Sequence, residues 1–171
     1  MLSFDQNSSN IYNSIAKSEF FISIAKTYLN SKNVMLRTHC YISNPIETDE
    51  VEQKNNAQFY HYDCDYKKFL KIFLYLTDVD IDSGPHTFIP FSHQKKKLIH
   101  VAAERMDNKV IDHNYKEYGK EIFIGDKGTI IFEDTFGFHK GEIPKSKSRA
   151  MLIFEYGIPP RIDIDGNEII L

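Results

Sequence analysis

Hydrophobic residues recur along this chain with two different periods. Over residues 11–29 they are spaced three and four positions apart, which predicts one amphipathic helix that buttresses a sheet. Over residues 34–42 and 149–156, apolar and polar residues alternate in the manner of strands. Residues 69–77 form a strongly apolar run. As a strand, this run would place Leu70, Ile72, Leu74 and Leu76 on one face and Phe69, Lys71, Phe73 and Tyr75 on the other.

Shorter stretches between turn-forming residues predict further strands at residues 58–63, 87–90, 122–124 and 129–132, with a turn at 125–128. Residues 93–122 are the least strand-like, and we expect an excursion there with a short helix near residues 101–106. Residues 161–171 are expected to form a small hairpin. One helix followed by many short strands predicts a mostly antiparallel β-sandwich or barrel. We expect a single domain over residues 1–171, with its core at about 34–156.

The composition argues against a nucleic-acid or membrane partner. The net charge is −3 and the pI is about 6.2, whereas a nucleic-acid-binding domain needs a strongly basic face. No apolar run reaches the roughly 18 residues of a membrane span, and the polar start of the chain does not resemble a signal peptide. Two cysteines, Cys40 and Cys64, are too few for a disulfide framework, so we expect a cytoplasmic protein. The basic residues 95–97 are expected to form a solvated loop.

The strongest candidate for chemistry is His61-Tyr62-Asp63. Residues two apart in a strand point to the same side, so His61 and Asp63 can direct an imidazole and a carboxylate at one point. A second histidine would complete the ligand set that holds Fe(II) in many non-haem oxygenases, which leaves metal positions open. Three histidines elsewhere are rival ligands. His39 is also explained as a strand histidine with an ordinary partner, and nothing pairs His100 and His113 at the spacing of metal ligands.

The residues after this pair carry a longer pattern. The apolar run is followed by Asp78-Val79-Asp80-Ile81-Asp82-Ser83-Gly84-Pro85 and then by Pro90-Phe91-Ser92-His93. This order resembles the phytanoyl-CoA dioxygenase-like family of Fe(II)/2-oxoglutarate-dependent oxygenases. In that family, H-x-D precedes a hydrophobic strand, a D-x-D-x-x-x-G-P turn and a P-G-S-H segment. Phe91 stands where the family has glycine.

A second family motif has its counterpart in Gly128-Thr129, Phe132, Asp134-Thr135, His139 and Gly141. The resemblance implies that His139 is the third metal ligand. It also implies that Arg149 binds the far carboxylate of 2-oxoglutarate and that Phe73 lines the cosubstrate pocket. Arginine suits this role because its planar, always charged fork can form two parallel hydrogen bonds to a carboxylate.

What the resemblance implies for the whole chain is a double-stranded β-helix, the jelly roll of cupins, with an N-terminal helix. The implied activity uses Fe(II), 2-oxoglutarate and O2 to hydroxylate a small molecule, with release of succinate and CO2. Related halogenases lack the carboxylate ligand, and the presence of Asp63 therefore favours hydroxylation.

Two other readings stay open. The chain could be a cupin-type metalloprotein that does not use 2-oxoglutarate, such as an isomerase, in which Arg149 forms a structural ion pair. It could also be a non-catalytic β-sandwich binding module. The substrate is left open among acyl-CoA, amino acid, sugar and natural product, as is the oligomeric state. Four side chains are candidates to line the cavity, with uncertain facing: Arg37, Lys71, Tyr60 and Tyr62.

Overall fold

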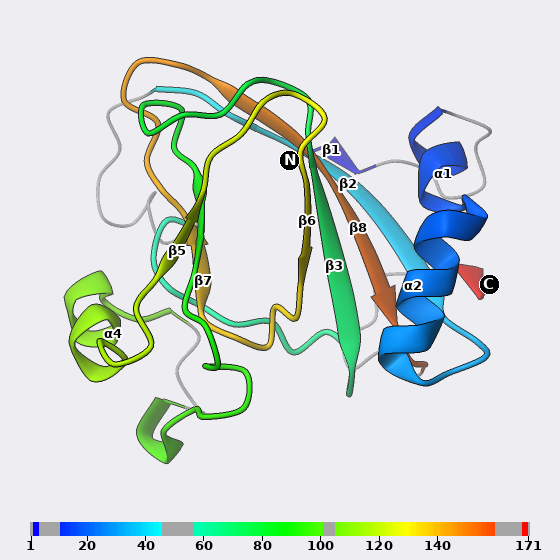
Figure 1. Ribbon diagram of the computed structural model, residues 1–171, viewed down its shortest axis with the longest axis horizontal. Helices are drawn as coiled ribbons and strands as arrows, with labels where there is room; N and C mark the ends of the chain where they lie inside the picture. The colour runs from blue at the N-terminus through cyan, green and yellow to red at the C-terminus, as the bar shows by residue number, and fades with distance from the viewer. Residues whose placement is uncertain (1, 4–10, 46–56, 101–104, 160–168, 171) are drawn as a thin grey trace.

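Two antiparallel sheets, one large and one small, make up most of the computed structural model (Figure 1), which describes residues 2–3, 11–45, 57–100, 105–159 and 169–170. The large sheet has the strand order β1-β2-β8-β3-β6, and β9 also pairs with β2. Its strands are β1 (Leu2–Ser3), β2 (Met35–Ser43), β3 (Phe69–Tyr75), β6 (Ile130–Glu133), β8 (Arg149–Gly157) and β9 (Ile169–Ile170). The small sheet has the order β5-β4-β7, from β4 (His86–Phe88), β5 (Glu121–Phe123) and β7 (His139–Gly141). This confirms the expected jelly-roll class.

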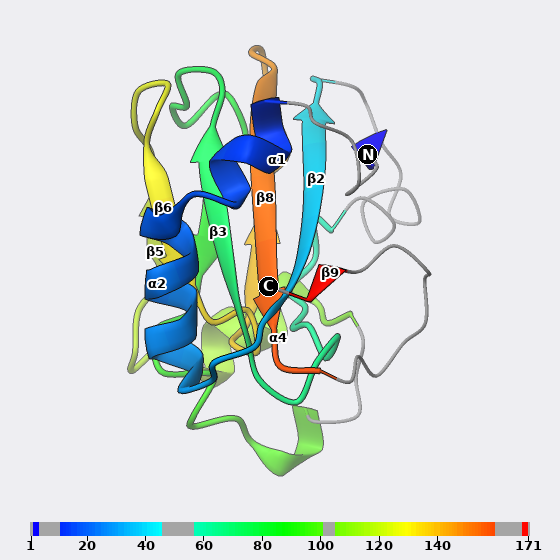
Figure 2. The ribbon, with the colours of Figure 1, turned by 90° about the vertical axis from the view of Figure 1, so that its right-hand side faces the viewer.

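Two helices cover the outer face of the large sheet (Figure 2), namely α1 (Ile11–Ala16) and α2 (Glu19–Leu29). Their apolar residues pack against alternate residues of β2, β3 and β8, which form the largest core cluster. The buried members of this cluster are Ala16, Phe21, Ala25, Leu29, Val34, Leu36, Cys40, Leu70, Ile72, Leu152, Phe154 and Tyr156. The buttressing role predicted for this part of the chain is therefore confirmed. None of the helices in the described residues is long and apolar enough to cross a membrane.

The predicted single helix over residues 11–29 is interrupted. Ser18 adopts an extended backbone, with φ −61° and ψ 144°, and occupies the N-cap position of α2. Its side chain makes no capping hydrogen bond to the first turn of the helix. The chain therefore bends at residues 17–18 and lays two short helices, in place of one long one, along the sheet. Asn30, in a left-handed conformation, ends α2.

The inner face of the large sheet carries the residues that alternate with this core. On β3 they include Lys71, Phe73 and Tyr75, as the apolar run predicted. Phe73 and Tyr75 join Val79, Ile131, Met151 and Ile153 in a second apolar cluster between the sheets. The strands β2, β3 and β8 begin and end within two residues of the predicted bounds. Their inner faces form one wall of the space in which the candidate site lies.

Two expectations about local structure were wrong. Residues 58–63 do not form a strand, because their backbone changes partner at almost every residue: Tyr60 bridges Met106, and His61 bridges His139. The strand, turn and strand predicted over residues 122–132 are present as β5 and β6, and the two strands belong to different sheets. The excursion contains a helix at α4 (Asn108–Asn114), later than expected, and a short 3-10 turn at η1 (Leu98–His100).

Two other expectations fall partly outside the described residues. Residues 101–104 of the helix expected near 101–106 cannot be compared, and Met106 forms a bridge with Tyr60 instead. Of the hairpin expected over residues 161–171, the described part is β9, which pairs with β2.

The turn after β4 shows how Phe91 replaces the family's glycine. Phe91 has a φ of +62°, in the left-handed region that glycine adopts without strain. Its carbonyl still accepts the hydrogen bonds of Gln94 and Lys95 that close the turn. The phenylalanine side chain is 57% exposed, and its ring lies 5.9 Å from that of Tyr118. The turn is therefore retained at the cost of backbone strain.

We expect Phe91→Gly to be more stable than Phe91→Ala by about 1 kcal/mol, since both lose the ring and only glycine relieves the positive φ. Urea unfolding of the two variants measures this difference, provided that both unfold with the same m-value. An alanine variant that is as stable as the glycine variant would show that the turn is unstrained.

Candidate functional site

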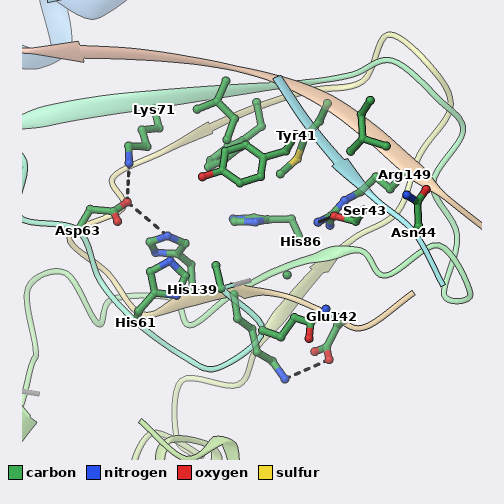
Figure 3. Close-up of a pocket in the computed structure, with 18 of the residues that line it drawn as sticks. Tyr41, Ser43, Asn44, His61, Asp63, Lys71, His86, His139, Glu142 and Arg149 are labelled. Carbon is green, nitrogen blue, oxygen red and sulfur yellow. Dashed lines mark hydrogen bonds and ion pairs between the residues drawn. The ribbon is translucent and has the colours of Figure 1, made fainter. Parts of the chain in front are cut away.

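A cavity of about 500 Å³ lies between the two sheets. Its walls come from β2, β3 and β8, from β4 and β7, and from the chain around residues 57–63. His61, Asp63 and His139 gather at one end, whereas Arg149 lies beside Ser43 and Asn44 at the other (Figure 3). His86 lies between the two groups, and Phe73 also lines the cavity. The sequence-predicted site residues are thus brought together around one space.

The three predicted metal ligands converge. One ligand atom each from His61, Asp63 and His139 lies within 4.8 Å of the others. The His139 Nε2 atom is 3.4 Å from Asp63 Oδ2, and the two imidazole ring centres are 4.2 Å apart. Two imidazoles and one carboxylate at this spacing can hold a divalent cation on one face.

Backbone pairing sets the positions of these side chains. His61 and His139 exchange two backbone hydrogen bonds of 3.0 and 2.9 Å, which makes an isolated antiparallel bridge at the edge of β7. The Asp63 amide donates to the carbonyl of Thr135 at 2.9 Å. The segment that carries H-x-D is therefore attached to the segment that carries His139, although it is not a strand.

Each histidine is oriented by the same local contact. The Nδ1 of His61 lies 3.0 Å from the carbonyl of Phe59, and the Nδ1 of His139 lies 3.0 Å from that of Gly137. An Nδ1–H donated to these carbonyls leaves Nε2 as the atom with a free lone pair. Burial lowers the pKa of both histidines, which keeps the imidazoles neutral and able to bind a metal.

Asp63 owes its charge to Lys71. Burial by itself would raise the pKa of the Asp63 carboxyl, but Lys71 and the two histidines hold this pKa well below its usual range. The Lys71 Nζ donates to Asp63 Oδ2 at 2.8 Å, and it also contacts Asp65 at 3.3 Å and Glu155 at 3.0 Å. The Lys71 side chain is 13% exposed, so these ion pairs are screened little by water.

Lys71 belongs to a row of charged side chains across the inner face of the large sheet. In the strand register Arg37 lies opposite Glu155, Glu155 opposite Lys71, and Lys71 opposite Glu133. Arg37 Nη1 is 4.0 Å from Glu155 Oε1. Side chains that are directly opposite on neighbouring strands are close enough to interact. We call Arg37, Glu155 and Lys71 the charged row.

Glu133 lies opposite Lys71 at the end of this row, where it contacts His86 and approaches His139. Its Oε2 atom is 2.9 Å from His86 Nε2, and its Oε1 atom is 3.9 Å from His139 Nδ1. Burial raises the pKa of Glu133 to about 8 and lowers the pKa of His86 to about 3. A protonated Glu133 can therefore donate to the neutral imidazole of His86. Sequence reasoning missed both residues; the signal available was that His86 directly follows the Gly84-Pro85 turn.

Arg149 begins β8 and is 4% exposed. Its Nη1 donates to the carbonyl of Gly84, and its Nη2 is 3.5 Å from Ser43 Oγ. The buried Nε has no hydrogen-bond partner. Gly141 leaves room for the guanidinium, because a Cβ there would lie 2.9 Å from Nη2. The glycine of the H-x-G motif is thus explained by the arginine that packs against it.

Lys96 contradicts the expectation of a solvated loop at residues 95–97. Its Nζ lies 3.0, 4.2 and 4.7 Å from the ring centres of Tyr62, Phe136 and Phe138, and it donates to the Phe136 carbonyl at 2.6 Å. Burial lowers the pKa of Lys96 to about 7. Tyr62 separates His61 from Asp63, and Phe138 precedes His139, so Lys96 ties together the segments that carry the candidate ligands.

The rival histidines do not line the cavity. His39 is buried on β2, His100 lies 3.2 Å from the hydroxyl of Tyr115, and His113 is exposed on α4. Among the four suggested lining residues, Lys71 contributes to the cavity wall, whereas Arg37, Tyr60 and Tyr62 do not.

We expect Lys71→Met to lower the free energy of unfolding by about 3 kcal/mol, because it removes the cation from a buried cluster of carboxylates. Without Lys71, burial favours the protonated form of Asp63, and a protonated carboxyl is a poor metal ligand. Mn(II) should therefore raise the melting temperature of Lys71→Met by less than that of the wild type.

The matched control is Lys67→Met, since Lys67 is exposed and lies four residues earlier. Thermal unfolding of the three proteins, with and without Mn(II), checks both effects. Equal stability of the Lys71 and Lys67 variants would mean that the ion pairs contribute nothing.

Comparison with solved structures supports the fold. The chain is similar to the epimerase SnoN in complex with Fe3+, alpha ketoglutarate and nogalamycin RO, with 16% identity and a TM-score of 0.68. That match covers 91% of this chain and 61% of SnoN. It is also similar to EctD from S. alaskensis with bound Fe, with 14% identity and a TM-score of 0.66. That match covers 89% of this chain and 58% of EctD. HygX from Streptomyces hygroscopicus with iron bound is similar too, with 12% identity and a TM-score of 0.63. That match covers 91% of this chain and 70% of HygX.

The chain thus spans about three fifths of the length of SnoN and of EctD. No curated protein matches its sequence. The family model described as Phytanoyl-CoA dioxygenase (PhyH) matches residues 5–150, which include all three candidate ligands and Arg149. On the strength of this match over most of its length, the chain belongs to the phytanoyl-CoA dioxygenase family.

Proposed function

We propose that this protein is an Fe(II)/2-oxoglutarate-dependent oxygenase that hydroxylates a small molecule and releases succinate and CO2. The observation that carries the proposal is the arrangement of four side chains around one cavity. His61, Asp63 and His139 bring their ligand atoms together at one end, and Arg149 lies at the other.

The residues present fit both groups that this chemistry requires. Two neutral imidazoles and an ionised carboxylate suit Fe(II) and leave positions on the metal for other ligands. Arg149 has a buried Nε without a partner, and a buried donor of this kind is normally satisfied. The far carboxylate of 2-oxoglutarate would supply the missing acceptor and would meet the guanidinium fork in a charge-assisted contact.

Fe(II), 2-oxoglutarate and O2 would together supply the oxidising power that breaks an unreactive C–H bond. The chain's own residues would orient and protect these groups. His61 and His139 present Nε2 because their Nδ1 atoms are bonded to carbonyls, and Lys71 keeps Asp63 ionised and fixed. Phe73 and His86 stand side by side on the cavity wall, with ring centres 4.5 Å apart. They would shield bound groups between the metal end and Arg149 from water.

Turnover of 2-oxoglutarate tests this proposal. With Fe(II) and O2, the wild type should release succinate and CO2, and His61→Ala should not. We expect Arg149→Met to raise the Kd for 2-oxoglutarate by about 100-fold, since it truncates one partner of a buried charge pair. Calorimetric titration of 2-oxoglutarate into the Mn(II)-loaded proteins measures this, with Arg149→Lys expected to recover only part of the affinity.

The outcome would separate the competing readings. A protein that binds metal through His61 but neither binds nor turns over 2-oxoglutarate would be a cupin-type metalloprotein of another kind. A protein whose biological activity survives His61→Ala would be a non-catalytic binding module.

Hydroxylation itself needs a separate measurement. SnoN is described as an epimerase and SnoK, also similar in fold with a TM-score of 0.59, as a carbocyclase. Once a substrate is known, turnover under ¹⁸O₂ distinguishes the reactions: a hydroxylated product carries one labelled oxygen atom, whereas an epimerised or cyclised product carries none.

A further inference from the structure

Arg105 is held at the cavity wall next to the candidate metal end. The Met106 amide donates to the Tyr60 carbonyl at 2.8 Å in an isolated antiparallel bridge. Arg105 directly precedes Met106, and both Arg105 and His61 line the cavity. Asn108 strengthens the attachment, because its Oδ1 accepts from the Tyr60 amide at 3.3 Å.

The guanidinium of Arg105 has no counter-ion in the part of the chain that the structure describes. Arg105 is exposed and lines the cavity, and none of the described ion pairs includes it. The other cations of the lining are engaged: Lys71 with Asp63 at 2.8 Å and Lys140 with Glu142 at 3.0 Å. Arg149 is the residue expected to hold 2-oxoglutarate. Arg105 is therefore the lining cation left for another ligand.

The charge of Arg105 reaches both walls of the cavity. Burial raises the pKa of Tyr41, a residue of β2 on the large sheet, and the charge of Arg105 partly offsets this rise. Tyr41 and His61 both line the cavity, so the guanidinium lies within electrostatic range of the space between them. An anion bound there would sit next to the candidate metal end and away from Arg149.

Gln58 adds a second unsatisfied group to this wall. Its side-chain Oε1 is buried without a hydrogen-bond partner, although Gln58 lines the cavity. Its backbone carbonyl is 3.5 Å from Asn108 Nδ2, which attaches it to the same segment as Arg105. A buried acceptor is normally matched by a donor, such as a hydroxyl or an amine, and a molecule bound beside Gln58 could supply one.

We propose that Arg105 binds an anionic group of the substrate, a carboxylate or a phosphate, and that Gln58 accepts a hydrogen bond from the same molecule. This inference rests on the proposed function, because it assigns the substrate of that oxygenase to small polar anions. A guanidinium suits this role since it stays charged at all physiological pH values and matches both groups with parallel N–H donors.

Matched pairs of small molecules test the inference: carboxylates with their primary amides, and phosphomonoesters with their parent alcohols. Binding is measured by ligand-observed NMR to protein loaded with Mn(II) and saturating 2-oxoglutarate, so that Arg149 is occupied. We expect the anionic member of a pair to bind the wild type about tenfold more tightly than the neutral member, as a charge-assisted hydrogen bond predicts. In Arg105→Gln this preference should disappear, and in Arg105→Lys it should be partly kept.

Lys95→Gln is the control, since Lys95 is exposed and does not line the cavity, and its preference should equal that of the wild type. The inference is overturned if the wild type does not prefer anions, or if Arg105→Gln retains the preference. It is also overturned if Arg105→Gln weakens 2-oxoglutarate binding as much as Arg149→Met does, which would assign Arg105 to the cosubstrate.

Failure of the proposed function would look different. In that case the wild type would not bind 2-oxoglutarate. The anion preference and its loss in Arg105→Gln could still be measured on protein loaded with Mn(II) alone.

Discussion

The ion pair between Lys71 and Asp63 is the contact on which the rest of the site depends. A carboxylate buried beside two neutral imidazoles would be protonated in the absence of a nearby cation, and a protonated carboxyl is a poor metal ligand. Lys71 prevents this from inside the large sheet, where it also bonds to Asp65 and Glu155. Its own pKa lies well above the usual value, because the carboxylates outweigh the effect of burial. The sheet therefore carries a charge on its inner face in order to keep the candidate ligand ionised.

The two faces of the large sheet serve different purposes, and strand alternation makes this possible. The outer residues of β2, β3 and β8 are mostly apolar and pack under α1 and α2 in the largest core cluster. The inner residues can then include Arg37, Lys71 and Glu155 without loss of the main core. Buried charges seldom stabilise a fold in net terms, so their position beside the candidate ligands fits a role in positioning.

The small sheet and the segment at residues 57–63 position the imidazoles by backbone contacts. The His61–His139 bridge fixes how far apart the two rings lie, and the Nδ1 contacts fix which nitrogen faces the cavity. Lys96 adds a third connection, because its ammonium contacts aromatic rings adjacent in sequence to all three candidate ligands. The result is a rigid polar end, with Arg149 at the opposite end of the same cavity.

The sequence by itself determined which strands have a buried face, since the alternation in β2, β3 and β8 is a local property of the chain. It also indicated the candidate site residues His61, Asp63, His139 and Arg149, because these residues belong to motifs with a fixed spacing along the sequence. Only the tertiary structure decided which groups support them. The charged row depends on cross-strand register, His86 meets Glu133 across two sheets, and Lys96 reaches Tyr62 from a distant loop. Contacts between segments far apart in the sequence also explain why residues 58–63 are not a strand and why β5 and β6 belong to different sheets. Local periodicity specifies which side of a segment is apolar, but it carries no information about the partner that the segment will meet.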